Sequence, residues 1–308
     1  MVNRVLIRIK VVQILYSYYL KGSNDLATAE KELIFSLNKS YELYHLLLFL
    51  LVELTREEQL RIDAAKNKYL LSDSDLNPDM KLANNVFIKK IAANKNLQEY
   101  IERQKISWSE ESDFLRYMLD KIKTSELYAE YLASEEQSFE IDREFWKKAF
   151  KTIIIPDENL LNLLESQSLY WNDDLDIIST FVLKSIKKYD DQSGDYQELL
   201  PMFKDDEDLE FARKLFRESV LNMDRNRELI DSHAKNWEIE RVALMDVVIM
   251  SAALMEIEKF PEIPLKVSLN EYIEIAKSYS TVKSGHFING ILNSIIVQLK
   301  KEGKLTKE

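Results

Sequence analysis

The 308-residue chain contains no cysteine, only five glycines and only five prolines. Without cysteine, the protein cannot form a disulfide, use a catalytic thiolate or bind a metal through a thiolate. Glycine and proline normally make up about 7% and about 5% of a sequence, so sandwiches, barrels and glycine-rich phosphate loops are disfavoured. The composition therefore predicts a chain that is almost entirely helical.

Long hydrophobic runs are also missing. The longest, at residues 46–52, is far shorter than the roughly 20 residues that cross a bilayer. The basic N-terminus is not followed by the apolar segment and small-residue cleavage site of a signal peptide. The three histidines are scattered along the chain without metal-ligand spacing. We expect a cytoplasmic protein that does not enter the membrane and has no metal, cofactor or catalytic residues.

Acidic residues outnumber basic ones by 53 to 42, which gives a net charge of −11. Taken alone, this excess argues against a nucleic-acid partner, because polyanions repel acidic proteins. The charge is unevenly distributed, however: residues 1–21 and 275–308 each carry +4, so residues 22–274 carry −19. If the two basic ends meet in the fold, they form the electropositive patch that nucleic acid requires. Otherwise each is a solvated helix face.

Hydrophobic periodicity predicts helices along most of the chain. The expected helices cover residues 4–20, 26–37 and 43–68, with weaker patterns over 80–103 and 109–134 and a long helix at 238–258. The sequence Ser268-Leu269-Asn270-Glu271 is typical of a capping box, which predicts a helix start there and an end near 278–281. A last helix has an apolar stripe from Ile288 to Leu299.

An internal repeat relates the middle of the chain to its C-terminal part. The pattern D-x-E-F-x-x-K-x-F begins at Asp142 and recurs 66 residues later at Asp208. The same offset relates Trp171 to Trp237, and the match needs no gap. We interpret the repeat as a duplicated helical unit, with residues 189–201 as the linker between the copies.

Three C-terminal segments are specific in sequence: I-P-L-K-V-S-L-N-E at 263–271, E-I-A-K at 274–277 and S-G-H-F-I-N-G-I-L at 284–292. They resemble the C-terminal signature of the NusB family of bacterial transcription antitermination factors. The N-terminal helix resembles the first helix of that family. Further matching positions are Arg4, Arg8, Val12–Ser17, Asp208–Phe216, Trp237, Arg241, Asp246 and Ala253–Glu256. The resemblance covers about residues 4–37 and 205–302.

Family members are usually about half as long as this chain. We therefore expect N-terminal NusB-like helices at 1–37, a helical insertion at 38–204 with a degenerate repeat of the NusB-like unit, and a C-terminal NusB domain at 205–308. The insertion lacks a counterpart of the I-P, N-E and F-x-N-G elements. This long form resembles the NusB of Bacteroides-type bacteria.

The resemblance implies an all-α fold of two perpendicular three-helix bundles, extended here by the partly duplicated insertion. It also implies a non-catalytic factor that binds boxA-type single-stranded RNA together with NusE, the small-subunit ribosomal protein. Such a factor loads onto the elongating RNA polymerase with other Nus factors, chiefly at ribosomal RNA operons.

The resemblance and the residue chemistry assign nine residues to RNA binding: Arg4, Arg8, Lys10, Tyr16, Lys277, Lys283, Ser284, His286 and Phe287. Cations on one helix face can neutralise phosphates, and aromatic rings can stack on unpaired bases. A serine that caps a helix leaves N–H groups suited to phosphate. Arg4, Arg8 and the segment 283–287 are predicted to form one surface. Both aromatic residues also fit an apolar core.

Two acidic residues, Glu240 and Asp246, lie on the helix that meets NusE in the family, although a solvated helix face explains them equally well. Two other functions stand as alternatives. NusB domains also occur fused to ribosomal RNA cytosine methyltransferases, but those enzymes use cysteines that this chain lacks. The chain could instead be a non-catalytic helical-repeat scaffold that holds a protein partner through its acidic insertion.

Overall fold

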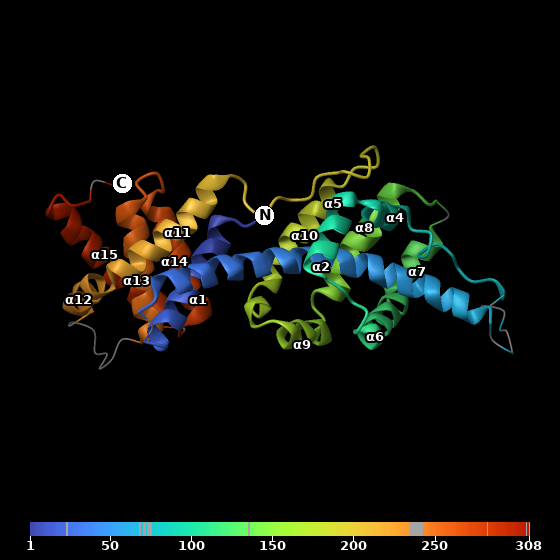
Figure 1. The fold of residues 1–308 in the computed structure, drawn as a ribbon, viewed down its shortest axis with the longest axis horizontal. Helices are drawn as coiled ribbons and strands as arrows, with labels where there is room; N and C mark the ends of the chain where they lie inside the picture. The colour runs from blue at the N-terminus through green and yellow to red at the C-terminus, as the bar shows by residue number, and fades with distance from the viewer. Residues whose placement is uncertain are drawn as a thin grey trace. The chain divides into compact units, whose positions relative to one another are not determined.

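The computed structural model describes residues 1–22, 24–67, 69, 72, 76–134, 136–234, 243–281, 283–305 and 307. These residues form helices and connecting turns and contain no strand (Figure 1). The all-α fold predicted from the sequence is confirmed. None of the described helices is long and apolar enough to cross a membrane.

The chain divides into two compact units. The terminal unit consists of residues 2–37 and 203–308, and the insertion unit consists of Met1 and residues 38–202. The units are defined by packing, whereas the predicted segments 1–37, 38–204 and 205–308 are defined by resemblance. The segment boundaries therefore stay a prediction.

The terminal unit is built around one buried helix, α13 (Leu244–Lys259). Every residue from Asp246 to Ile257 is buried, as expected for a helix surrounded by others. It packs against α1, α11, α12, α14 and α15. Helix α13 is a member of two groups of three mutually packed helices. The first group is α1, α11 and α13, and the second is α13, α14 and α15. The bounds are α1 Arg4–Leu20, α11 Asp206–Leu221, α12 Met223–Ala234, α14 Leu265–Tyr279 and α15 Ser284–Lys301.

The insertion unit contains most of helix α2 (Leu26–Ala65), whose first residues belong to the terminal unit. Trp108 and Trp171 anchor other segments to α2, because their indole N–H groups donate to the carbonyls of Leu46 (3.2 Å) and Lys39 (2.8 Å). Helix α8 packs against α4, α7 and α10. The other bounds are α4 Val86–Ala93, α5 Lys95–Gln104, α6 Ser112–Lys123, α7 Glu126–Ala133, α8 Phe139–Ala149, the π-helical turn η1 Phe150–Ile154, α9 Glu158–Gln167, the 3₁₀ turn η2 Leu169–Trp171 and α10 Leu175–Lys188.

Two expectations about helix boundaries are wrong. The predicted helices 26–37 and 43–68 form the single helix α2, because the intervening residues include no glycine or proline. Ser40, in that stretch, is buried and donates to Asp174 (2.5 Å). Helix α14 begins at Leu265 and not at Ser268. The Ser268 hydroxyl lies inside the helix and donates to the buried Glu256 (2.7 Å), so it does not cap the helix.

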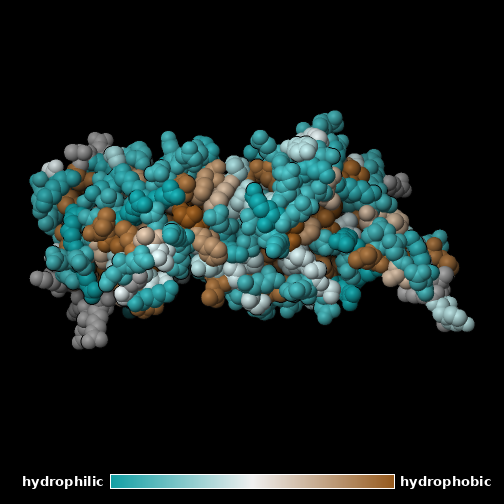
Figure 2. Space-filling view, viewed as in Figure 1, coloured by the Kyte–Doolittle hydropathy of each residue, from teal (hydrophilic) through white to brown (hydrophobic). Residues whose placement is uncertain are grey.

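The two copies of the repeat have the same order of helices. Adding 66 to the bounds of α8–η1, α9 and α10 gives 205–220, 224–233 and 241–254, close to the bounds of α11, α12 and α13. Descent of the copies from one ancestral unit stays a prediction. Hydrophilic residues cover most of the visible surface of each unit, and hydrophobic atoms form only small patches there (Figure 2).

Candidate nucleic-acid interface

Helix α1 is fixed in the terminal unit by a buried ion pair. The Arg8 side chain is 3% exposed and makes two hydrogen bonds to the fully buried Glu256, at 2.7 Å from Nε and 2.8 Å from Nη2. Glu256 also accepts from the hydroxyls of Ser268 and Tyr272 (3.1 Å). Burial opposes the charged guanidinium, but the hydrogen bonds and charge of Glu256 outweigh it and raise the pKa of Arg8. This cluster joins α1, α13 and α14.

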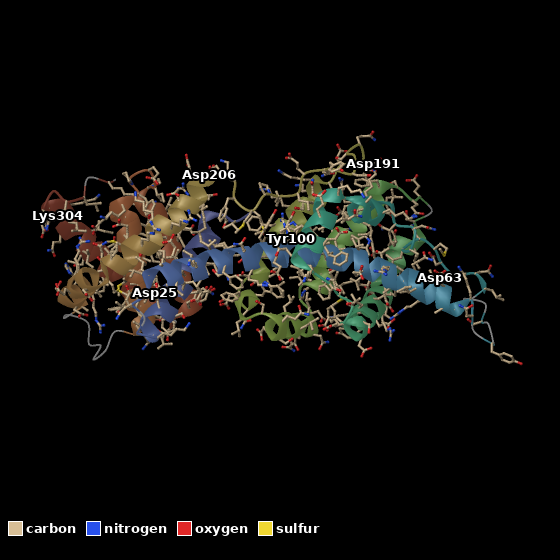
Figure 3. The ribbon with its side chains drawn as sticks, in the orientation of Figure 1. Asp25, Asp63, Tyr100, Asp191, Asp206 and Lys304 are labelled. Carbon is tan, nitrogen blue, oxygen red and sulfur yellow. The ribbon has the colours of Figure 1, made fainter. Side chains whose placement is uncertain are left out.

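The predicted RNA contacts on α1 therefore lie in different environments. Arg8 and Lys10 (1% exposed) are inside the unit and do not present their charges to solvent. Arg4 is partly exposed, and its guanidinium lies over the Phe211 ring (5.1 Å) and 3.6 Å from Asp208. Asp206, labelled in Figure 3, belongs to the same first turn of α11. Tyr16 is half-buried.

The turn between α14 and α15 is held by Asp246, which is 6% exposed. Its carboxylate accepts from the Ser280 hydroxyl (2.6 Å) and from the Ser284 hydroxyl (3.1 Å). Ser284 Oγ in turn accepts from the Thr281 N–H (3.2 Å). Asp246 and Ser284, which the sequence assigned to NusE and RNA, are thus used inside the protein to fix this turn. Glu240 lies outside the described residues.

The outer side of the same turn is cationic. Lys277, Lys283 and His286 are exposed, and the last two have no ion-pair partner among the described residues. Lys277 pairs with Glu274 (2.5 Å) and lies beside Gly285, where an added Cβ would be 3.3 Å from Lys277 Cγ. Gly285 therefore lets the lysine stem pack against the first turn of α15. Phe287, one residue after His286, is 4% exposed and faces the core.

The end of α14 lies beside the middle of α1. Gln13 Nε2 donates to the Tyr279 hydroxyl (3.3 Å). Arg4 is nine residues before Gln13, which corresponds to about 13 Å along the helix. Tyr16 is one turn after Gln13, on the same side of α1. We call Tyr16, Lys277, Lys283 and His286 the turn surface, whereas Arg4 lies beside α11.

Sequence reasoning missed Glu256, Ser268 and Tyr272 as the partners of Arg8. A signal was available, because Glu256 is a single carboxylate in the apolar run from Val247 to Ile257. A charge in such a run needs a buried partner. The sequence did not indicate which cation would supply it.

The protein belongs to the all-helical class, and its turn surface presents exposed cations beside a turn that Asp246 holds by hydrogen bonds. The described residues contain no cluster of metal-binding side chains. A family model, described as the NusB family, matches residues 174–297. The transcription antitermination protein NusB of Salinibacter ruber is 40% identical over 132 residues, which are 41% of this chain and 82% of that protein. The chain belongs to the NusB family.

Two further relatives have the same name. The protein of Desulfatibacillum aliphaticivorans is 39% identical over 99 residues, 32% of this chain and 69% of that protein. The protein of Chloroherpeton thalassium is 41% identical over 98 residues, 32% of this chain and 46% of that protein. No solved structure matches the chain. The family resemblance inferred from the sequence is confirmed.

Proposed function

We propose that this protein is a transcription antitermination factor that binds RNA as a non-catalytic module. The observation that carries the proposal is the turn surface, where exposed cations project from a turn that Asp246 fixes. Three relatives with 39–41% identity are named transcription antitermination proteins. A preformed cationic surface gains affinity for RNA because phosphate contacts release bound counterions.

The expected ligand is boxA-type single-stranded RNA, bound together with NusE. The complex would join the RNA polymerase elongation complex with other Nus factors, chiefly at ribosomal RNA operons, in the cytoplasm. Lys277, Lys283 and His286 are the proposed phosphate contacts, and Tyr16 is the proposed stacking residue. Arg4 is proposed as an outlying contact beside α11.

The buried members of the predicted site have supporting roles in this proposal. Arg8 fixes α1 against α13 and α14, and Lys10 is buried with it. Asp246 and Ser284 position the turn, while Phe287 anchors the start of α15 in the core. Glu240 is the remaining proposed NusE contact.

The test is RNA affinity of a Lys277→Gln/Lys283→Gln variant, measured by fluorescence anisotropy with a boxA RNA and NusE present. Each phosphate contact in single-stranded RNA contributes about 0.7 to the slope of log K against log salt concentration. We expect affinity about tenfold lower and a slope smaller by about 1. The matched control is Lys300→Gln/Lys301→Gln, at the other end of α15, which changes the net charge equally. Equal affinities of all three proteins would rule out the turn surface as the RNA site.

A further inference from the structure

The two units differ strongly in charge. Residues 38–202 contain 21 basic and 31 acidic residues, whereas the rest of the chain contains 21 basic and 22 acidic residues. The insertion unit therefore carries −10 of the total charge of −11. Any cationic surface on this unit stands against a strongly acidic background.

Nine cations of the insertion unit form ion pairs with carboxylates among the described residues. The paired residues are Lys39, Arg56, Arg61, Lys66, Lys90, Arg116, Lys121, Lys123 and Lys147. Lys151, Lys184 and Lys187 are exposed and have no carboxylate partner within 4.0 Å among the described residues, as is also true of Lys89, Lys95, Arg103, Lys105, Lys148 and Lys188. Their charges remain available to an external partner.

Lys151, Lys184 and Lys187 belong to helices that pack against each other. Arg143, Lys147 and Lys151 recur at intervals of four, which places them along one side of α8 and η1. Helix α10, which contains Lys184 and Lys187, packs against both α8 and η1.

One hydrogen bond identifies the side of α8 that faces the end of α10. Arg143 Nη1 donates to the carbonyl of Tyr189, the residue that follows α10 (3.0 Å). We call Arg143, Lys147, Lys151, Lys184 and Lys187 the basic face. Within it, Glu144 pairs with Lys147 (2.6 Å), and the other four cations have no carboxylate partner in the described structure.

The repeat provides an internal comparison for this face. The offset of 66 relates Lys147 to Arg213 and Lys151 to Arg217, so the terminal unit also has cations on this side of the helix. There, Glu30 lies 3.5 Å from Arg213 Nε and 2.5 Å from Arg217 Nε. The same helix side is thus neutralised in the terminal unit, while Lys151 remains uncompensated in the insertion unit.

We propose that the basic face binds the phosphate backbone of RNA that flanks the segment held by the turn surface. The inference rests on the proposed function. A partner held here must be recognised by charge, because none of the exposed large hydrophobic side chains belongs to α8, η1 or α10. A polyanion fits this chemistry, since counterion release provides affinity without apolar contact. A protein interface normally needs buried aromatic or aliphatic anchors.

The experiment compares Lys151→Gln/Lys184→Gln/Lys187→Gln with the wild-type protein, with NusE present. The probes are a short boxA RNA and the same RNA with about 30 unstructured nucleotides added on either side, titrated by anisotropy across a range of salt concentrations. We expect the flanked RNA to bind the variant about tenfold more weakly, with a slope smaller by about 2, and the short RNA to bind unchanged. The matched control is Lys66→Gln/Lys95→Gln/Lys105→Gln, three exposed lysines elsewhere in the insertion unit.

Equal binding of the flanked RNA to the variant, the control and the wild-type protein would overturn the inference. An unchanged RNA affinity together with loss of an acidic protein from a pull-down would overturn it in favour of a protein partner. Failure of the short RNA to bind the wild-type protein would instead contradict the proposed function. In that case, a smaller salt slope for the variant than for the wild-type protein on the flanked RNA would still support phosphate binding at the basic face.

Discussion

The two copies of the repeat use one helix order but bury different charges. Asp142 in the insertion unit is fully buried, and its carboxylate accepts from the Tyr131 hydroxyl (2.5 Å) and the Val86 N–H (2.6 Å). Its repeat partner Asp208 lies near the surface, 3.6 Å from Arg4. The terminal unit instead buries Glu256 with Arg8. A shared helical frame therefore does not determine which carboxylate becomes part of the core.

The insertion unit also has a buried histidine cluster. The His45 ring stacks on Tyr100 with centroids 3.7 Å apart and meets Tyr41 edge-on. Its Nδ1 lies 2.9 Å from the Tyr41 carbonyl. Burial lowers the pKa of His45 to about 4, so the ring is neutral near pH 7. The core polar groups of the terminal unit include a charged pair, whereas this cluster of the insertion unit is neutral.

The largest effect is expected from breaking the buried pair of the terminal unit. Arg8→Met leaves the Glu256 carboxylate buried without its cation, which typically costs about 3–5 kcal/mol of unfolding free energy. Urea unfolding followed by circular dichroism measures the change. The control is Arg225→Met, which removes an exposed arginine that makes two 2.9 Å hydrogen bonds to Glu258 on the same helix α13. It should cost at most about 1 kcal/mol. Similar costs for both variants would contradict the description of Arg8 as buried.

The second prediction compares the two repeat positions directly. Asp142→Ala leaves the Tyr131 hydroxyl and the Val86 N–H without their acceptor, and we expect a loss of about 3 kcal/mol. Asp208→Ala removes a partly exposed carboxylate and should cost less than about 1 kcal/mol. Both are measured by urea unfolding. If the two costs were equal, the copies would be alike in burial, contrary to the structure.

The third prediction concerns pH and the insertion unit. Because the folded-state pKa of His45 is lowered from 6.5 to about 4, protonation favours the unfolded state once the pH falls below 6.5. The His45 contribution is complete above that pH, and about 2 kcal/mol of it is lost between roughly pH 7.5 and pH 5.

Tryptophan fluorescence reports mainly on this unit, since Trp108, Trp146 and Trp171 belong to it. The urea midpoint should therefore fall less with acid in His45→Phe, which retains an aromatic ring but cannot be protonated. Parallel pH profiles for the two proteins would show that His45 is not the titrating group.

The smallest expected effect tests the neutralised side of α11. Glu30→Gln removes the carboxylate that pairs with both Arg213 and Arg217. If charge pairing is what distinguishes this side from the basic face, the freed arginines should raise the salt slope for non-specific RNA by about 1. Anisotropy titrations with an oligo-uridine RNA measure it, and Glu53→Gln, which removes a carboxylate paired with Arg56, is the control. If the salt slope of Glu30→Gln equals that of the wild-type protein, charge pairing does not explain the difference between this side of α11 and the basic face.

Local sequence patterns predicted some elements well and others poorly. Helix α1 occupies the predicted residues 4–20, because its apolar spacing is regular and Asn3 caps it through the Leu6 N–H (2.9 Å). The predicted break in α2 does not exist, since a few polar residues do not end a helix without a glycine or proline. The capping-box pattern at Ser268 predicted the wrong start for α14, because the Ser268 hydroxyl donates to the buried Glu256 and does not cap the helix.

The same limit applies to the candidate site. Lys277, Lys283 and His286 are exposed as an RNA contact requires, and the segments that resemble the family contain Lys277 and His286. Arg8, which shares a helix face with Arg4 by spacing, is buried, while Arg4 is partly exposed. Spacing along a helix shows which residues share a side, but it does not show which neighbour covers that side.

The sequence by itself determined the helical class, the family and the uneven charge along the chain, because composition and local motifs are sufficient for these. Only the tertiary structure decided which charged side chains are buried and paired inside the protein. Arg8 and Glu256 are 248 residues apart, and Asp246 and Ser284 are 38 apart. Such partners meet only when α13 is surrounded by its neighbours, and desolvation in that core then makes each pairing obligatory.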